Sequence, residues 1–139
     1  MSDFIIDASV AISLIFEDES SPYSDAVADS LKSGQAVAPV VRPLEVANSI
    51  LTSVRRGRIP AADVPRLFGA MIRLRVAIDQ GIDPENVARV ALDLGLTYRL
   101  SAYDASYLDL AMRRGLPLAT LDQRLRDAAM AAGVQLYEP

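Results

Sequence analysis

The sequence predicts a single three-layer α/β/α domain, residues 1–139, with a mostly parallel sheet of four to five strands. Short apolar segments alternate with longer helical segments along the whole chain, an order that is typical of strand–helix–strand units. Each short segment is apolar on both faces, as expected when helices cover both sides of the sheet. No repeat, low-complexity stretch or linker divides the 139 residues, and this length fits one domain.

The N-terminal part begins with a strand that is followed by two helices. Residues 4–6 (FII) form a short buried strand, and the chain turns at Asp7 into the first helix. After the acidic, serine-rich break EDESSP, residues 22–33 are predicted to form the second helix. Glycine favours helix C-termini, so this helix is expected to end near Gly34.

The middle of the chain contributes one strand and a pair of helices. Residues 36–40 (AVAPV) are an apolar run of strand length. The helix 42–56 begins with Pro43 in its first turn, where the missing N–H leaves no helical hydrogen bond unmade. With a further helix at 61–74, residues 41–74 form a helix pair between the second and third strands.

The C-terminal part alternates strands with helices. The predicted strands are residues 75–79 (RVAID), 116–121 (LPLATL) and 134–138 (VQLYE). A helix starts at Asp83-Pro84 and is expected to end at about Leu94, because Gly95 follows. The last two helices are predicted at 101–114 and 122–132, and a glycine follows each.

Composition limits the chemistry of this chain. It contains neither cysteine nor histidine, which excludes disulfides, zinc sites with Cys or His ligands, and catalysis by a histidine base. The net charge of −4 lacks the basic excess of many nucleic-acid-binding domains. The chain shows neither a basic leader nor the ~20 consecutive apolar residues of a membrane span, so we expect a soluble, cytoplasmic protein.

Four acidic residues fall at the predicted carboxyl edge of the sheet. Asp7 follows the first strand, and Asp122 follows the fourth. Glu45 lies in the first turn of the helix after the second strand, and Asp104 lies in the first turn of the helix before the fourth. Ligands of open parallel sheets bind beyond the carboxyl ends of the strands, so we expect these carboxylates to lie near one another. Asp79, at the end of the third predicted strand, is a weaker candidate.

Each acid alone also suits a structural role. Asp7 and Asp122 are typical helix N-caps. Ser101 and Asp104 match a capping box, and Glu45 complements a helix dipole. Four clustered carboxylates are harder to explain by capping, because two of them ~4 Å apart repel by about 4 kcal/mol at an effective dielectric constant near 20.

A carboxylate cluster of this kind needs protons or a cation to neutralise it. A ligand set of oxygens without nitrogen or sulfur favours Mg²⁺ or Mn²⁺. Such an ion activates a water molecule for hydrolysis and polarises a phosphodiester. The residues therefore favour a metal-dependent hydrolase.

At these residues the sequence resembles PIN-domain nucleases, and among them the VapC-type toxins of type II toxin–antitoxin (VapBC) pairs. The similar stretches are FIIDASVAISLIF, PLEVANSIL, LSAYDASYLDLAMRRGLPLATLDQRL and AGVQLYE, which cover residue 3 to about residue 138. The order and spacing of these stretches carry the resemblance. It implies a PIN-like fold and a metal-dependent ribonuclease.

The resemblance also implies roles for individual residues. The family's catalytic and metal-binding acids correspond to Asp7, Glu45, Asp104 and Asp122. Thr120 matches a Ser or Thr that supports the site. Ser9 and Asn48 occupy positions that are often polar and near the metal.

Substrate and partners follow from the same resemblance. It implies cleavage of RNA such as tRNA or rRNA, a VapB-type antitoxin whose C-terminal segment occupies the groove, and a homodimer. The candidate phosphate contacts are Arg55, Arg56, Arg58, Arg113 and Arg114, although arginine near a helix C-terminus also complements the helix dipole. Apolar side chains of 41–74 form a candidate dimer or antitoxin surface, with burial in the core as the alternative.

Other function classes fit less well or stay open. A phospho-receiver domain needs a lysine near its last strands, and the only lysine is Lys32. A haloacid-dehalogenase-type phosphatase needs a second aspartate where Ser9 stands. The open alternatives are a free-standing PIN nuclease in RNA processing and a non-catalytic PIN-like module that binds RNA or protein.

Overall fold

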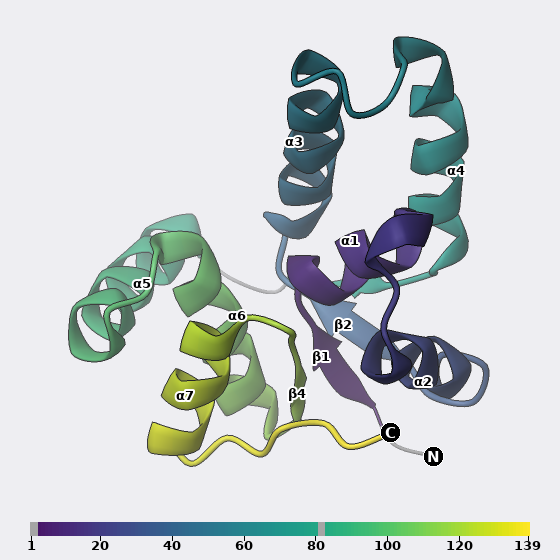
Figure 1. Ribbon diagram of the computed structural model, residues 1–139. Coiled ribbons are helices and arrows are strands. Elements are labelled where there is room, and N and C mark those ends of the chain that lie inside the picture. Colours follow the sequence, from purple (N-terminus) through teal and green to yellow (C-terminus); the bar gives the residue numbers. More distant parts are fainter. Residues whose placement is uncertain (1–2, 81–82) are drawn as a thin grey trace.

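A four-stranded parallel sheet lies at the centre of the computed structural model, which describes residues 3–80 and 83–139 (Figure 1). The strands are β1 (Phe4–Ile6), β2 (Ala36–Ala38), β3 (Ala77–Ile78) and β4 (Leu118–Ala119), in the spatial order β3-β2-β1-β4. All neighbouring strands run parallel. Their carboxyl ends therefore meet at one edge, as the sequence predicts.

Helices cover both faces of the sheet and confirm the three-layer prediction (Figure 1). On one side lie α1 (Ala8–Ile15) and α2 (Pro22–Ser30), and on the other lie α5 (Pro84–Tyr98), α6 (Ala102–Arg114) and α7 (Gln123–Ala131). The helices α3 (Arg42–Arg55) and α4 (Val64–Arg73) rise as a pair beyond the carboxyl edge. Short 3₁₀ turns at Glu17–Glu19 and Ala61–Asp63 precede α2 and α4.

Two hydrophobic clusters hold these layers together. The larger one packs β1, β2 and β4 against side chains of α2, α6 and α7, with Phe4, Ile5 and Ile6 fully buried. The smaller one joins α1 to the helix pair and includes Val46 of α3 and Leu67 of α4. This second cluster packs α3 against α1, and the packing positions the first turn of α3 beside the sheet.

The last predicted strand, 134–138, is reduced to one parallel bridge between Leu118 and Leu136. The Leu118 N–H donates to Gln135 O at 2.9 Å, and the Tyr137 N–H donates to Leu118 O at 2.8 Å. β4 has only two residues, so it offers a very short edge for pairing. The Tyr137 ring stacks on Phe4 with centroids 4.1 Å apart, and this contact fixes the segment.

The predicted end of α5 at Leu94 is wrong. The helix continues through Gly95 to Tyr98, and Arg99 ends it in the left-handed conformation with φ 58°. A Cβ atom on Gly95 would lie 3.0 Å from Leu100 O. This glycine therefore permits the close return of the chain rather than ending the helix.

Among the helices that the structure describes, none has both the length and the apolar character required to cross a membrane.

Candidate active site

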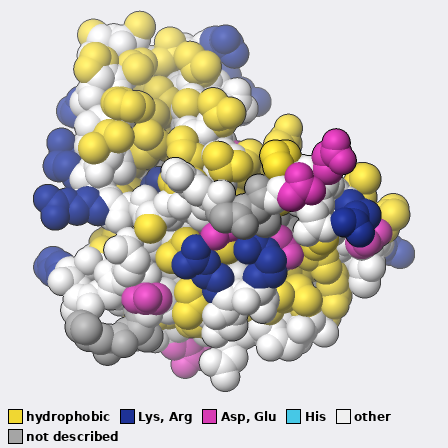
Figure 2. Space-filling model, turned by 180° about the vertical axis from the view of Figure 1, so that it is seen from behind, with side chains coloured by type: hydrophobic (Ala, Val, Ile, Leu, Met, Phe, Trp, Pro, Cys, Tyr) yellow, Lys and Arg dark blue, Asp and Glu magenta, His cyan; other side chains and the backbone are white. Residues whose placement is uncertain are grey.

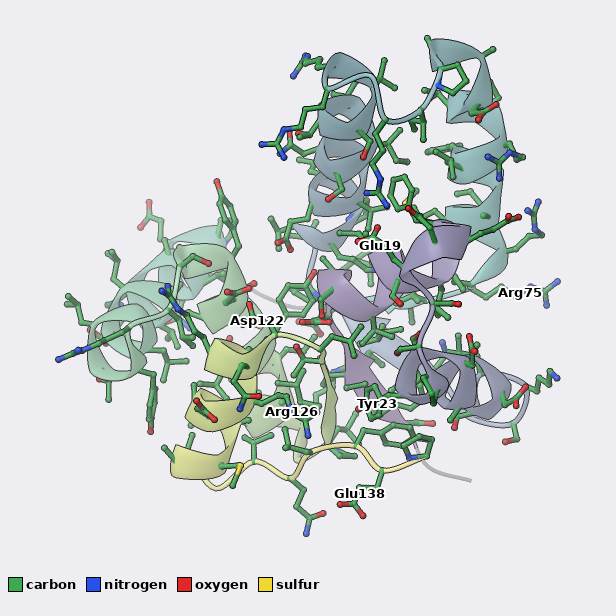
Figure 3. The ribbon with its side chains drawn as sticks, viewed as in Figure 1. Glu19, Tyr23, Arg75, Asp122, Arg126 and Glu138 are labelled. Carbon is green, nitrogen blue, oxygen red and sulfur yellow. The ribbon has the colours of Figure 1, made fainter. Side chains whose placement is uncertain are left out.

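Two of the four predicted acids cap helices that start at the carboxyl edge of the sheet. Asp7 directly follows β1, and its Oδ1 accepts a hydrogen bond from the Val10 N–H at 3.1 Å at the start of α1. Asp122 caps α7, where its Oδ1 accepts from the Arg124 N–H at 2.9 Å. Figure 3 shows Asp122 at the end of α7 nearest to this edge. Capping and clustering are therefore compatible here.

The other two acids come from first turns of helices. Glu45 lies in the first turn of α3, and Asp104 lies in the first turn of α6. Ser101 caps α6 by accepting from the Asp104 N–H at 3.1 Å. Glu45 and Asp104 are both partly exposed, so their carboxylates remain accessible from solvent.

A hydroxyl network holds Asp7, which is only 3% exposed. Ser9 Oγ donates to Asp7 Oδ1 at 2.6 Å, and Thr120 Oγ1 donates to Asp7 Oδ2. Ser9 Oγ in turn accepts from the Leu121 N–H, and Thr120 Oγ1 accepts from the Asp122 N–H, each at 3.0 Å. These amides keep both hydroxyls oriented as donors toward Asp7.

The pKa shifts couple each of the four carboxylates to at least one other. Burial raises the pKa of Asp7 to about 6, and the negative charge of Asp104 adds to the rise. Burial also raises the pKa of Glu45, with contributions from the charges of Asp104 and Asp7. The pKa of Asp104 is raised by burial and by the charge of Asp122. The site therefore combines partial burial with mutual repulsion.

Tyr107 orients Glu45 from the facing helix. Its hydroxyl donates to Glu45 Oε1 at 2.8 Å, and its ring is fully buried. Tyr107 lies one turn after Asp104 on α6, so both residues project from similar faces of that helix. The sequence alone did not single out Tyr107, although its i, i+3 spacing from Asp104 was an available signal.

The donor chemistry of this cluster fits a hard divalent cation. Among the described residues, the ion pairs involve none of Asp7, Glu45, Asp104 and Asp122. Their oxygens are the ligands that Mg²⁺ and Mn²⁺ prefer. Within residues 3–80 and 83–139, no three acidic side chains are spaced closely enough to hold an ion together as they stand. A divalent cation would offset the repulsion between these carboxylates.

Three of the predicted arginine contacts are engaged in ion pairs. Arg58 contacts Asp18 at 2.8 Å and Glu19 at 3.3 Å. Arg113 and Arg114 contact Asp79 at 3.1 and 2.7 Å. A phosphate group would have to displace a carboxylate before it could bind any of these three arginines.

Arg55 and Arg56 differ from the other predicted arginines. Both are exposed near the end of α3, and the ion pairs found among the described residues include neither of them. Asn48, one turn after Glu45 on α3, is also exposed. These three side chains are open to solvent on the helix that carries Glu45.

Asp79 belongs to a separate cluster. It is buried, and burial would raise its pKa, but hydrogen bonds and positive charge from Arg114 and Arg113 outweigh this and hold the pKa below its usual range. Asp109 also contacts Arg113, at 2.9 Å. The contacts with arginine therefore distinguish Asp79 from the other four acids, for which the described part of the chain shows no ion pair.

Arg126 is a second residue near the site that the sequence alone did not single out. Its guanidinium donates to Thr120 O at 3.1 Å and lies 5.8 Å from the centroid of the Tyr23 ring. In Figure 3, Arg126 and Tyr23 approach each other from α7 and α2. This contact supports the turn that carries Thr120 and Asp122.

Comparisons with known proteins agree with this architecture. The model of the PIN domain family matches residues 4–130. Among solved structures, the chain is similar to PAE2754 from Pyrobaculum aerophilum, with a TM-score of 0.66, 24% identity, and coverage of 92% of this chain and 87% of that chain. It is also similar to FitAcB from Neisseria gonorrhoeae, with a TM-score of 0.55, 19% identity, and coverage of 100% and 98%. No curated protein matches the sequence.

Proposed function

The chain belongs to the PIN domain family, a family of nucleases, and from that premise we propose that it is a Mg²⁺- or Mn²⁺-dependent endoribonuclease and the toxin of a toxin–antitoxin pair. The observation that carries this proposal is the position of Asp7, Glu45, Asp104 and Asp122 around the carboxyl edge of the sheet, where each carboxylate is coupled electrostatically to at least one other. The pKa values of Asp7, Glu45 and Asp104 are raised. A cluster with this charge favours a cation-dependent reaction over a purely structural role.

Residues of this chain would hold the cation and position the substrate. Asp7 offers a carboxylate fixed by Ser9 and Thr120, and Glu45 offers one oriented by Tyr107. Asp104 and Asp122 complete the donor set from the starts of α6 and α7. When bound, a divalent cation lowers the pKa of a water molecule and offsets charge that develops on the phosphodiester.

RNA is the proposed substrate because the motifs resemble those of VapC-type toxins. Arg55 and Arg56 are exposed on the helix that carries Glu45, so they are the arginines best placed to contact phosphate without first breaking an ion pair. The net charge of −4 makes the bound cation important for tolerating RNA near the carboxylates.

The proposed partners are a VapB-type antitoxin and a second copy of the chain. Phe68 and Ile72 lie one turn apart on α4 and are 52% and 58% exposed. Figure 2 shows hydrophobic side chains gathered over the part of the surface formed by α3 and α4. Exposed apolar patches of this kind are typical of protein–protein contact surfaces.

The test is cleavage of total RNA with Mg²⁺ or Mn²⁺ by the wild type, Asp104→Asn and Asp93→Asn. Asp93 is exposed on α5, outside the carboxylate cluster, so its variant is a matched control. Loss of a cation ligand is expected to reduce cleavage by Asp104→Asn at least ~100-fold, while Asp93→Asn retains wild-type activity. Equal cleavage by Asp104→Asn, or no cleavage by the wild type with either metal, would contradict the proposal.

Induced expression in a bacterial host separates the toxin from its alternatives. A toxin is expected to arrest growth as the wild type but not as Asp104→Asn. A free-standing nuclease of RNA processing would cleave RNA without arresting growth. A non-catalytic binding module would retain RNA without cutting it.

A further inference from the structure

An open groove lies beside the carboxylate cluster, between α1, α3 and the start of α6. Its volume is about 670 Å³, and its lining includes Ile12, Leu44, Glu45, Asn48, Ser49 and Tyr103. We propose that this groove, called here the Tyr103 groove, holds one unpaired nucleobase of the RNA, stacked on the Tyr103 ring, next to the phosphodiester that is cut. This inference rests on the proposed ribonuclease function.

The position of the groove follows from residues that it shares with the cluster. Glu45 lines the groove and also belongs to the four acids. Tyr103 immediately precedes Asp104 in the first turn of α6. A phosphodiester held at the acids therefore brings a neighbouring nucleotide to the mouth of the groove.

The charge of the lining selects which part of a nucleotide enters. The residues that line the groove include one carboxylate and neither lysine nor arginine. A phosphate inside the groove would therefore meet no cationic side chain of the lining. The uncharged base is the part of a nucleotide that this lining accepts.

Aromatic and apolar surfaces provide contacts for a base. Tyr103 is 59% exposed and Leu44 is 73% exposed, and both line the groove. Proteins bind single-stranded nucleic acid by stacking bases on aromatic side chains of this kind. Bases inside a duplex are already stacked on their neighbours, so the ligand is an unpaired base.

Asn48 and Ser49 add polar groups to the same lining. The amide of Asn48 offers both a donor and an acceptor, and the hydroxyl of Ser49 can act as either. Asn48 is exposed and lies one turn beyond Glu45 on α3. These groups can hydrogen-bond to the edge of a base while Tyr103 contacts its face.

The experiment compares Tyr103→Ala with Tyr103→Phe, each in an Asp7→Asn background that prevents cleavage. The probe is a short single-stranded RNA labelled at one end, and a matched set carries an abasic nucleotide at each position in turn. The control is Leu92→Ala, which removes an exposed apolar side chain from α5 outside the groove. Binding is measured by fluorescence anisotropy, and the oligomeric state of each variant is measured by sedimentation.

We expect Tyr103→Ala to weaken RNA binding about tenfold or more, because stacking is lost. Tyr103→Phe, which keeps an aromatic face, and Leu92→Ala are expected to bind within about twofold of the background protein. One abasic position is expected to weaken binding to the Tyr103 protein and to have no further effect on Tyr103→Ala. Such non-additivity identifies the base that contacts Tyr103.

Unchanged RNA binding by Tyr103→Ala would overturn the inference, as would additive effects at every abasic position. If Tyr103→Ala binds RNA normally but alters the oligomeric state, the groove is a protein contact and the inference fails. In either case cleavage of RNA by the wild type leaves the proposed function standing. A wild type that neither binds nor cleaves RNA would remove both.

Discussion

Two acidic clusters of this molecule differ in how their negative charge is balanced. Asp79 and Asp109 contact Arg113, and Asp79 also contacts Arg114. The acids of the candidate active site make no ion pair among the described residues. The pKa shifts differ accordingly, because Arg114 and Arg113 lower that of Asp79, whereas burial raises that of Asp7.

This difference supports the proposal that the acids of the candidate active site bind a cation, whereas Asp79 and Asp109 are balanced by arginines of the chain itself. A buried acid with arginine partners is neutralised by the chain itself. A cluster of acids without such partners costs folding free energy until protons or a cation neutralise it. Carboxylates with raised pKa values at the carboxyl edge of a parallel sheet are thus better explained by binding than by stability.

The largest expected effect that tests this comparison concerns the pH dependence of stability through Asp7. Its pKa is about 6 in the folded protein, against 3.8 as the ordinary value. Because folding raises this pKa, the folded protein favours the protonated form of Asp7. The stability that this carboxyl contributes is fully present below the unfolded-state pKa and is lost as the pH rises through about 6. The shift corresponds to about 3 kcal/mol of lost stability at neutral pH.

The measurement is denaturant unfolding of the wild type and Asp7→Asn in EDTA, from about pH 4 to about pH 8. The difference in free energy of unfolding is expected to move by about 2.5 kcal/mol in favour of Asp7→Asn across this range, because a small part of the loss is already present at about pH 4. Asp93→Asn, at an exposed position on α5, serves as the control and should show no such trend. If the difference in free energy of unfolding between Asp7→Asn and the wild type stays constant with pH, burial does not raise the pKa of Asp7.

The second effect concerns the arginine-paired cluster and has the opposite sign. Asp79→Asn removes the carboxylate that Arg114 contacts and one of the two that Arg113 contacts, so it is expected to reduce the free energy of unfolding by about 2 kcal/mol at neutral pH. Loss of a buried ion-pair partner costs more, but Arg113 and Arg114 are 34% and 43% exposed and retain contact with water. Denaturant unfolding measures the loss.

The control for Asp79→Asn is Asp29→Asn, which breaks an exposed pair with Lys32. This variant is expected to unfold like the wild type. RNA cleavage per folded molecule should be unchanged by Asp79→Asn. If a folded Asp79→Asn protein does not cleave RNA, Asp79 contributes to the active site and the two clusters are not functionally separate.

The sequence predicted the strands and most helices because their signals are local. β1 and β2 are short runs of apolar residues, and their full burial follows from helices on both faces. The predicted position of the four acids depended on one general rule, that the carboxyl ends of parallel strands share an edge. Their convergence follows from strand order and not from side-chain detail.

The features that the sequence did not predict depend on contacts between distant segments. The bond from Tyr107 to Glu45 joins α6 to α3, and the contacts of Arg113 and Arg114 with Asp79 join α6 to the end of β3. The sequence predicts that Gly95 ends α5, but the position of Leu100 O determines the role of this glycine. Each feature depends on distances that only the packed layers determine.

The smallest expected effect tests whether the orientation of the Glu45 carboxylate, in addition to the charge of the four acids, distinguishes the candidate active site from the cluster around Asp79. Tyr107→Phe removes the hydroxyl that donates to Glu45 Oε1 but keeps the buried ring. Groups that orient metal ligands typically change metal affinity 10- to 100-fold. We expect Mn²⁺ affinity to fall about tenfold, or about 1.4 kcal/mol, at the lower end of this range because Glu45 is one of four proposed ligands.

Calorimetric titration with Mn²⁺ measures this effect without any dependence on cleavage, and Tyr103→Phe is the matched control on the same helix. Tyr103 is 59% exposed, and its hydroxyl makes no hydrogen bond to the four acids among the described residues. A purely structural role for Tyr107 predicts lost stability with unchanged Mn²⁺ affinity. In that case the two acidic clusters would differ only in how their charge is balanced. A selective loss of Mn²⁺ affinity would instead mean that the buried Tyr107 also orients Glu45 for binding the cation.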